Sequence, residues 1–381
     1  MKENLNNLWA SMEANKNKKI SMTIGLDGFV DEIIHLVDKR NDFESFTRIP
    51  TLEALGHRIN RAAGLSTNIE MVPVQVKLGG NGPILSNALL NYGVNLTYIG
   101  ALGKPGIHPV FQDLAEKSQK VYSLCDPGHT DALEFEDGKL LLGKLTTLNE
   151  ITWERFKEIV GNPDKIAAMI DNCTLFGMEN WTMLPYMGEI WQGLIDEVFP
   201  LLKEKPGGEL KPLAFFDLAD PEKRTKEDIL AAMKQIGKFE ERFRAVLGLN
   251  EKELYEIADV FGVEADSSAN PAERMRSAAT KTYAHLGIYC LVVHPVKEAC
   301  CCIGSEYYQV EGPYCDRPLL TTGAGDNFNA GFCLGQSLGM SPTDSLTLGV
   351  CTSGFYVRNA KSPTYSETMD FAMQWAEQNT I

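Results

Sequence analysis

The stretch that decides the fold is Thr321-Thr322-Gly323-Ala324-Gly325-Asp326-Asn327-Phe328-Asn329-Ala330, which continues into Gly331-Phe332. Residues 319–320 are predicted to end a buried strand, and residues 330–338 are predicted to form a helix. Two glycines one residue apart allow the backbone to turn tightly and to approach a ligand. The helix N-terminus beyond them offers unpaired N–H groups and the positive end of a dipole, which suits an anion. We therefore expect an anion hole at Gly323, Ala324 and Gly325, with Asp326 beside it. The alternative is an ordinary glycine turn with an N-capping Asp.

The full string resembles the carboxy-terminal signature of the ribokinase-like family of sugar kinases, also called the PfkB family. The resemblance implies that Gly323, Ala324 and Gly325 present N–H groups to the transferring phosphoryl group and that Thr322 contacts the nucleotide. It also implies that Asp326 accepts the proton of the attacking hydroxyl. Phosphoryl transfer requires mainly positioning, charge stabilisation and such a proton acceptor. No G-x-x-x-x-G-K-[ST] motif occurs, and Phe328 stands where a dinucleotide-binding fingerprint has its third glycine.

Composition limits the possible partners. The chain has 381 residues, 44% of them hydrophobic and 23% charged, which is typical of a globular protein. Its net charge of −15 argues against nucleic acid or an anionic membrane as a partner. We expect a cytoplasmic protein, because the nine cysteines are accompanied neither by an apolar run of membrane-span length nor by a signal peptide at the polar start. Neighbouring side chains of Cys300-Cys301-Cys302 point to opposite faces in a strand, so the three cannot jointly bind one tetrahedral metal.

The order of apolar segments predicts an α/β protein. Strands, among them residues 20–26, 96–102, 167–176, 213–218 and 290–294, alternate with helices, which favours a mostly parallel, Rossmann-like sheet with helices on both faces. Strands near residues 31–37, 72–78 and 133–142 break this rhythm, the last as a hairpin around Asp137-Gly138. We assign residues 31–79 and 132–145 to a small β-rich lid, and residues 19–30, 80–131 and 146–381 to the core of a ribokinase fold. Pro206-Gly207-Gly208 is expected to form a loop.

Two segments are expected to bind the acceptor. Gly79-Gly80-Asn81 with the helix that follows resembles the amino-terminal family signature that closes around the sugar, although Ile84 replaces a habitual Asn. A tight turn before a capped helix is the alternative. Asp31 looks like the family's Asp that holds sugar hydroxyls after the first strand, with Asp27 as the second choice. A carboxylate suits a polyol because it accepts hydrogen bonds from two hydroxyls. Asp31 could equally be a solvated loop acid.

Asn250 and Glu253 form an N-x-x-E motif at the start of a helix. A capping box accounts for it structurally. In the family, N-x-x-E follows in the same order and organises the magnesium ion and the phosphates through water, which suits the hydration of Mg²⁺. The resemblance therefore implies that Asn250 and Glu253 contribute to binding the cofactors ATP and Mg²⁺.

Two positions depart from the family pattern. Leu320 replaces an Asp that serves a monovalent cation site, and His294-Pro295-Val296 replaces a Thr-x-Gly turn against the nucleotide, so the adenine contacts are unplaced. The sequence still predicts an ATP- and Mg-dependent kinase for a hydroxyl of a sugar or related polyol, with a possible homodimer through the lid. The alternatives are an ADP-dependent sugar kinase and a catalytically weak sugar- or nucleotide-binding protein of the same fold.

Overall fold

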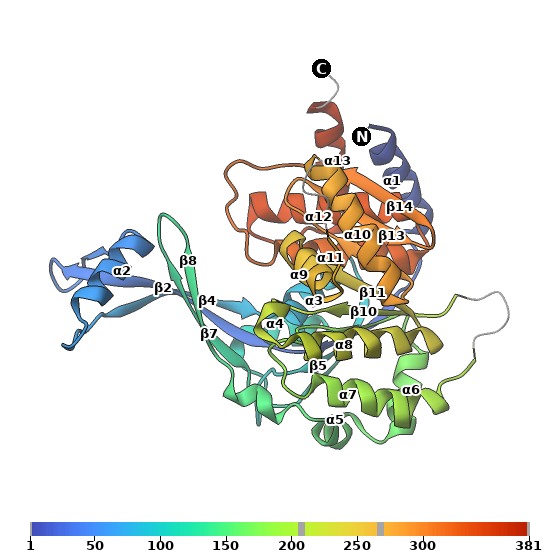
Figure 1. Cartoon of the computed structure of the whole chain (residues 1–381), viewed down its shortest axis with the longest axis horizontal. Coiled ribbons are helices and arrows are strands. Elements are labelled where there is room, and N and C mark those ends of the chain that lie inside the picture. Colours follow the sequence, from blue (N-terminus) through green and yellow to red (C-terminus); the bar gives the residue numbers. More distant parts are fainter. Residues whose placement is uncertain (1, 205–209, 265–269, 379–381) are drawn as a thin grey trace.

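The body of the protein is built on one large sheet, shown in Figure 1. The computed structural model describes residues 2–204, 210–264 and 270–378, so the loop expected at Pro206-Gly207-Gly208 lies outside the described residues. The sheet order is β14-β13-β12-β11-β10-β9-β1-β5-β6, parallel from β12 to β6, with β13 and β14 added antiparallel. The strands are β1 (Ser21–Leu26), β5 (Asn95–Gly100), β6 (Lys120–Ser123), β9 (Leu175–Met178), β10 (Leu213–Asp217), β11 (Arg244–Leu249), β12 (Cys290–Val293), β13 (Glu298–Ile303) and β14 (Glu306–Glu311).

Helices cover both faces of this sheet, which confirms the predicted fold class. Side chains alternate along each strand, so Phe215 packs into one hydrophobic core and Phe216 into the other. The core around Phe215 is completed by α1 (Lys2–Asn15), α3 (Asn81–Asn91), α4 (Gln112–Lys117), α11 (Ala324–Leu338), α12 (Pro342–Asn359) and α13 (Tyr365–Gln378). The core around Phe216 is completed by α5 (Trp153–Val160), α6 (Pro163–Asp171), α7 (Met187–Gly193), α8 (Lys226–Lys238), α9 (Glu251–Val260) and α10 (Pro271–Leu286).

Two predicted strands are wrong. Residues 167–171 belong to α6, because Asn162 caps that helix and Pro163 opens it, and the strand β9 begins only at Leu175. Residues 319–320 form no strand: Leu319 is 72% exposed, and its N–H donates to the carbonyl oxygen of Val357 on α12 (2.8 Å). This apolar pair therefore lies in a loop held against a helix.

A second sheet extends from the body as an arm (Figure 1). It contains β2 (Phe29–Arg40), β3 (Phe46–Arg48), β4 (Met71–Gly79), β7 (Gly128–Glu134) and β8 (Lys139–Lys144), and β2 pairs with β3, β4 and β7. The β7–β8 hairpin encloses Asp137-Gly138. At the far end, α2 (Leu52–Arg61) covers a small core around Ile34 and Leu133. Strands β2 and β7 begin at Phe29 and Gly128, slightly before the predicted lid segments. We retain the name lid for this sheet and α2.

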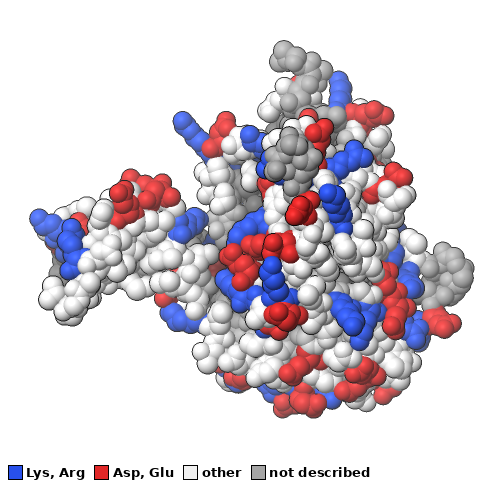
Figure 2. Space-filling view, viewed as in Figure 1, with Lys and Arg blue, Asp and Glu red and all other residues white. Residues whose placement is uncertain are grey.

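Acidic and basic side chains are interspersed on the face seen in Figure 2. Over α8 and α9, Lys252 pairs with Glu222 (2.6 Å) and Lys226 pairs with Asp259 (2.5 Å). In the part of the chain that the structure describes, no helix is both long enough and apolar enough to span a bilayer.

Candidate active site

The glycine turn at Gly323 is the start of helix α11, which begins at Ala324 rather than at residue 330 as predicted. Gly323 is the N-cap with φ 91°, a left-handed conformation that favours glycine. The Ala324 N–H closes the turn by donating to the Thr321 carbonyl oxygen (3.1 Å). The first N–H groups of a helix have no intrahelical acceptor. Asp326 is the third residue of the helix, so its carboxylate and these N–H groups lie at one end of α11.

The Asp326 side chain is 8% exposed and accepts a hydrogen bond from Asn81 Nδ2 (3.0 Å). Burial raises the pKa of the Asp326 carboxyl well above its ordinary value, the negative charge of Asp27 adds to this, and the Asn81 bond opposes it. A carboxylate with a raised pKa is a stronger base. The arrangement suits proton transfer at a reacting hydroxyl.

The turn Gly79-Gly80-Asn81 leads from β4 into α3, where Gly80 is the N-cap with φ 97°. Asp27 holds this turn, because its carboxylate accepts the N–H groups of Asn81 (2.9 Å) and Gly82 (3.0 Å). Asn180 Nδ2 donates a third bond to Asp27 (2.9 Å). Burial raises the pKa of Asp27 to about 6. Asp27 is 0% exposed, so in this conformation it presents no free oxygen to a sugar.

Asp31 lies on β2 with its carboxyl group directly over Gly79. A Cβ atom added at Gly79 would meet the Asp31 Cγ at 2.3 Å, so any other residue there would displace the Asp31 carboxyl group. Burial raises the pKa of Asp31, and a hydrogen bond with Thr130 opposes the shift. The charges of both Asp326 and Asp31 act on the phenol of Tyr356, whose pKa is raised first by burial and then by these two groups. Asp31 lies over Gly79 and Asp326 is bonded to Asn81, two residues further on, so both carboxyl groups adjoin the same turn.

Three polar residues that the sequence did not single out lie at the carboxyl ends of β9 and β10. Glu179 is fully buried, and among the described residues neither of its carboxylate oxygens has a hydrogen-bond partner. Burial, followed by the charges of Asp217 and Asp326, raises its pKa well above the ordinary value. Asn180 binds Asp27, and Asp217 accepts a bond from Asn329 Nδ2 (3.1 Å). The available signal was position, because ligands bind at the carboxyl ends of parallel strands.

The backbone is constrained at the same strand ends. Asn180, Ala219 and Asp220 have φ values of 64°, 57° and 60°, which non-glycine residues rarely adopt. Such conformations concentrate at functional sites, where the surrounding structure enforces them.

Asn250 and Glu253 form a complete capping box at the start of α9. Asn250 Oδ1 accepts the Glu253 N–H (3.0 Å), and Glu253 Oε2 accepts the Asn250 N–H (2.9 Å). The other Glu253 oxygen accepts the Asp220 N–H (3.0 Å). Burial and then the charge of Glu253 raise the pKa of Asp217 well above its ordinary value. Two buried carboxyl groups that repel each other are oxygen donors that a hydrated Mg²⁺ fits.

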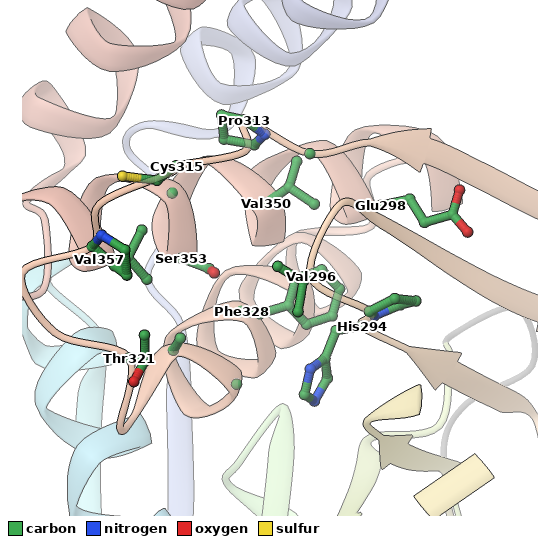
Figure 3. Close-up of a pocket in the computed structure, with 16 residues that line it drawn as sticks. His294, Val296, Glu298, Pro313, Cys315, Thr321, Phe328, Val350, Ser353 and Val357 are labelled. Carbon is green, nitrogen blue, oxygen red and sulfur yellow. The ribbon is translucent and has the colours of Figure 1, made fainter. Parts of the chain in front are cut away.

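A cavity of about 260 Å³ adjoins the other side of the glycine turn (Figure 3). Its lining is mainly apolar and includes His294, Val296, Pro313, Phe328, Val350 and Val357. His294 packs beside the turn, because a Cβ atom at Gly325 would meet its Cε1 at 2.8 Å. Burial lowers the pKa of His294 to about 4, so the imidazole is neutral. The contacts that the sequence left unplaced thus have a candidate location between β12, α11 and α12.

Comparison with known proteins agrees with this geometry. Residues 10–375 match the family described as prokaryotic ketohexokinase. A ketohexokinase of Haloferax volcanii is 31% identical over 350 residues, which cover 91% of this chain and 89% of that protein.

Solved structures share the fold at low sequence identity. Ribokinase from Thermotoga maritima has a TM-score of 0.62 at 16% identity and covers 93% of this chain and 99% of its own. Adenosine kinase from Sinorhizobium meliloti has a TM-score of 0.64 at 16% identity, with coverage of 94% and 99%. Phosphofructokinase-2 from Escherichia coli has a TM-score of 0.63 at 13% identity, with coverage of 93% and 99%.

These matches confirm the resemblance and the predicted activity, a sugar kinase that transfers a phosphoryl group to an alcohol. The chain belongs to the prokaryotic ketohexokinase family, within the ribokinase-like sugar kinases.

Proposed function

We propose that the protein transfers the γ-phosphate of ATP, with Mg²⁺, to a hydroxyl of a ketohexose. The observation that carries the proposal is the hydrogen bond between Asn81 and Asp326, which joins the turn at the base of the lid to the start of α11. It brings the expected acceptor-binding segment to the expected base. The ketohexose follows from the name of the family and of the Haloferax relative.

In the proposed reaction, Asp31, Gly79, Gly80 and Asn81 orient the acceptor. Its hydroxyl oxygen forms a bond to the γ-phosphorus, the bond from that phosphorus to the bridging oxygen breaks, and ADP leaves. Asp326 takes the hydroxyl proton. N–H groups at the start of α11, within the predicted anion hole of Gly323, Ala324 and Gly325, stabilise the charge on the transferring group.

Glu253 and Asn250 would hold the magnesium ion through water, with Asp217 contributing charge nearby. Each Glu253 oxygen accepts one N–H and retains a further acceptor position for a water molecule. Bound Mg²⁺ neutralises charge on the phosphates of the nucleotide. The buried pair Asp217 and Glu253 supplies the negative charge that attracts it.

The nucleotide base would occupy the cavity beside His294, with Thr322 and the glycine turn next to the phosphates. A mainly apolar lining suits a planar aromatic ring. The lid would close over the acceptor and exclude water, which limits hydrolysis of ATP.

We also propose a homodimer formed through the lid, in a cytoplasmic protein. Exposed apolar side chains lie on the lid strands, and Val76 on β4 and Leu142 on β8 share the face opposite to that of Asp31. Such a patch marks an interaction surface. All nine cysteines are free thiols, as in a reducing compartment. A monomer by light scattering at micromolar concentration would contradict the dimer.

The decisive experiment is a panel of ketohexoses, aldohexoses, pentoses and nucleosides with ATP or ADP as donor and Mg²⁺ present. We expect turnover with a ketohexose and ATP, measured as ADP release and as sugar phosphate. Turnover with ADP and release of AMP would identify an ADP-dependent kinase. Binding of sugar and nucleotide without turnover above that of Asp326→Asn would identify a binding protein.

A further inference from the structure

Lys77 on β4 is a partly buried cation without a counter-ion. Among the described residues no carboxylate is in ion-pair contact with it, whereas its neighbours on the lid, Lys139 and Lys144, pair with Glu134 (2.9 Å) and Asp131 (2.9 Å). Burial lowers the pKa of Lys77, and the charge of Asp31 opposes this. Lysines are seldom withdrawn from water unless they are paired. The ammonium group of Lys77 is therefore available to bind a group other than a carboxylate of the protein.

Its position points to the acceptor. Lys77 is the direct cross-strand partner of Asp31, and Thr130 is the partner of Asp31 on the other side, so all three side chains leave the same face of the lid. Lys77 lines a cleft of about 690 Å³ together with Tyr356 and Ile84. These last two residues contact the anion-hole turn, because a Cβ atom at Gly323 would meet the Tyr356 hydroxyl at 2.8 Å and Ile84 Cγ2 at 3.1 Å.

We propose that Lys77 determines acceptor specificity: its ammonium group donates hydrogen bonds to oxygens of the sugar while Asp31 accepts from an adjoining hydroxyl. This inference rests on the proposed function and extends it. A hydroxyl that accepts from an ammonium group and donates to a carboxylate spans at most about 5.5 Å between the two. Lys77 and Asp31 interact electrostatically without an ion pair, which leaves room for such a bridging hydroxyl.

The net charge of this face of the lid indicates that the acceptor is neutral. Asp31, Glu134, Lys77 and Lys139 lie together there, and their charges sum to zero. A phosphate ester would bring about two negative charges beside Asp31 without a surplus of positive charge. The inner face of the lid thus favours a sugar over a sugar phosphate.

The test uses Lys77→Met, Lys77→Arg and the control Lys144→Met. Lys144 lies on the opposite face of the lid, is paired with Asp131 and does not line the cleft. We expect Lys77→Met to raise the KM and the calorimetric Kd for the ketohexose by about 10- to 100-fold, because a hydrogen bond from a charged group is lost. The kcat and the KM for ATP should stay within about 3-fold, and Lys77→Arg should recover part of the loss. Lys144→Met should change each constant by less than about 2-fold.

Unchanged sugar affinity in Lys77→Met, or an equal loss in Lys144→Met, would overturn the proposal. A second arm compares the ketohexose with its 1- and 6-phosphates on the wild-type protein. Tighter binding of a phosphate ester, abolished by Lys77→Met, would overturn the neutral-acceptor assignment. Absence of turnover with every sugar would refute the proposed function instead, and the calorimetric comparison would still decide the role of Lys77.

Discussion

The proposed acceptor end of the site contains four buried carboxyl groups, Asp27, Asp31, Glu179 and Asp326, whereas the proposed nucleotide end is an apolar cavity next to a neutral imidazole. Burial raises the pKa of each carboxyl group. Protons and hydroxyl groups must be handled at the acceptor end, so buried charge is useful there despite its cost. A nucleotide base needs only shape and an apolar lining. Substitutions at the acceptor end should therefore lower kcat or the affinity for the acceptor. Substitutions at the nucleotide end should lower the affinity for the nucleotide.

The largest effect is expected from Asp326→Asn, which should lower kcat by about 100- to 10,000-fold, the range for losing a general base. Nucleotide affinity should change little, because the anion hole is formed by backbone groups. Asp344→Asn is a matched control: Asp344 is also the third residue of its helix, α12, and is also 8% exposed. A kcat for Asp326→Asn close to that of Asp344→Asn would refute the assignment of the base.

The second effect concerns stability. The folded-state pKa of Asp27, about 6, lies above the unfolded value of about 3.9, so the protonated form is favoured in the folded protein. This contribution is present below about pH 3.9 and is lost as the pH rises through about 6. It amounts to about 3 kcal/mol of unfolding free energy.

Urea denaturation between pH 4 and pH 7 measures this contribution of Asp27 to the free energy of unfolding. Asp27→Asn cannot ionise, so the difference between wild-type and variant stability should change in favour of the variant as the pH rises. Parallel curves for the two proteins would show that Asp27 keeps an ordinary pKa in the folded state.

The third prediction separates the faces of one lid strand. Asp31→Ala should lower kcat/KM for the acceptor by about 10- to 150-fold, because a charged hydrogen-bond acceptor is lost. The KM for ATP should change little. Glu32→Ala is the control, because Glu32 follows Asp31 on β2 and points to the opposite face. If the acceptor effect appears in Asp27→Ala and not in Asp31→Ala, the assignment of the sugar ligand must move to Asp27.

The fourth prediction concerns the nucleotide end. Ser353 on α12 lines the cavity in Figure 3, so Ser353→Phe should partly fill it. We expect the KM for ATP to rise about 10-fold, the cost of about 1.4 kcal/mol, with acceptor affinity unchanged. Asn359→Phe places the same side chain at an exposed position of the same helix. Equal behaviour of the two variants would indicate that the nucleotide binds elsewhere.

The distance along the chain between the residues of the site decides which of them could be predicted from the sequence. The proposed anion hole and Asp326 are four consecutive residues, Gly323 to Asp326, and the Gly79-Gly80-Asn81 turn is equally local, so their motifs were visible. Glu179 and Asp217 lie 38 positions apart and come together only because β9 and β10 are neighbours in the parallel sheet. Asp27 binds the start of α3 across 54 positions, so its hold on the glycine turn depends on the tertiary fold.

The wrong elements have local causes. The apolar pair Leu319-Leu320 carries the composition of a strand end, but its N–H groups bond to Val357 on α12. The helix α11 was predicted too late because Gly323, Ala324 and Gly325 were treated as a loop, whereas Gly323 is its N-cap. Capping geometry was the missing information, and the proposed anion hole belongs to the first turn of the helix.

The smallest effect is expected from monovalent cations. Where the family has an Asp, this chain has Leu320, which lines the same cleft as Lys77 and Tyr356. Binding a cation there would require its dehydration next to an isobutyl group, which costs several kcal/mol without a compensating charge. The turn is held instead by α12, through the Tyr356 hydroxyl that donates to the Thr322 carbonyl oxygen (2.7 Å) and through the bond from the Leu319 N–H to Val357.

Activity should therefore agree within about 2-fold in potassium, sodium and tetramethylammonium buffers of equal ionic strength, where exposed charges are screened equally. Leu320→Asp supplies the missing carboxylate and is expected to make the rate depend on potassium. Several-fold activation of the wild-type protein by potassium alone would show that carbonyl oxygens near the turn form the cation site without that carboxylate.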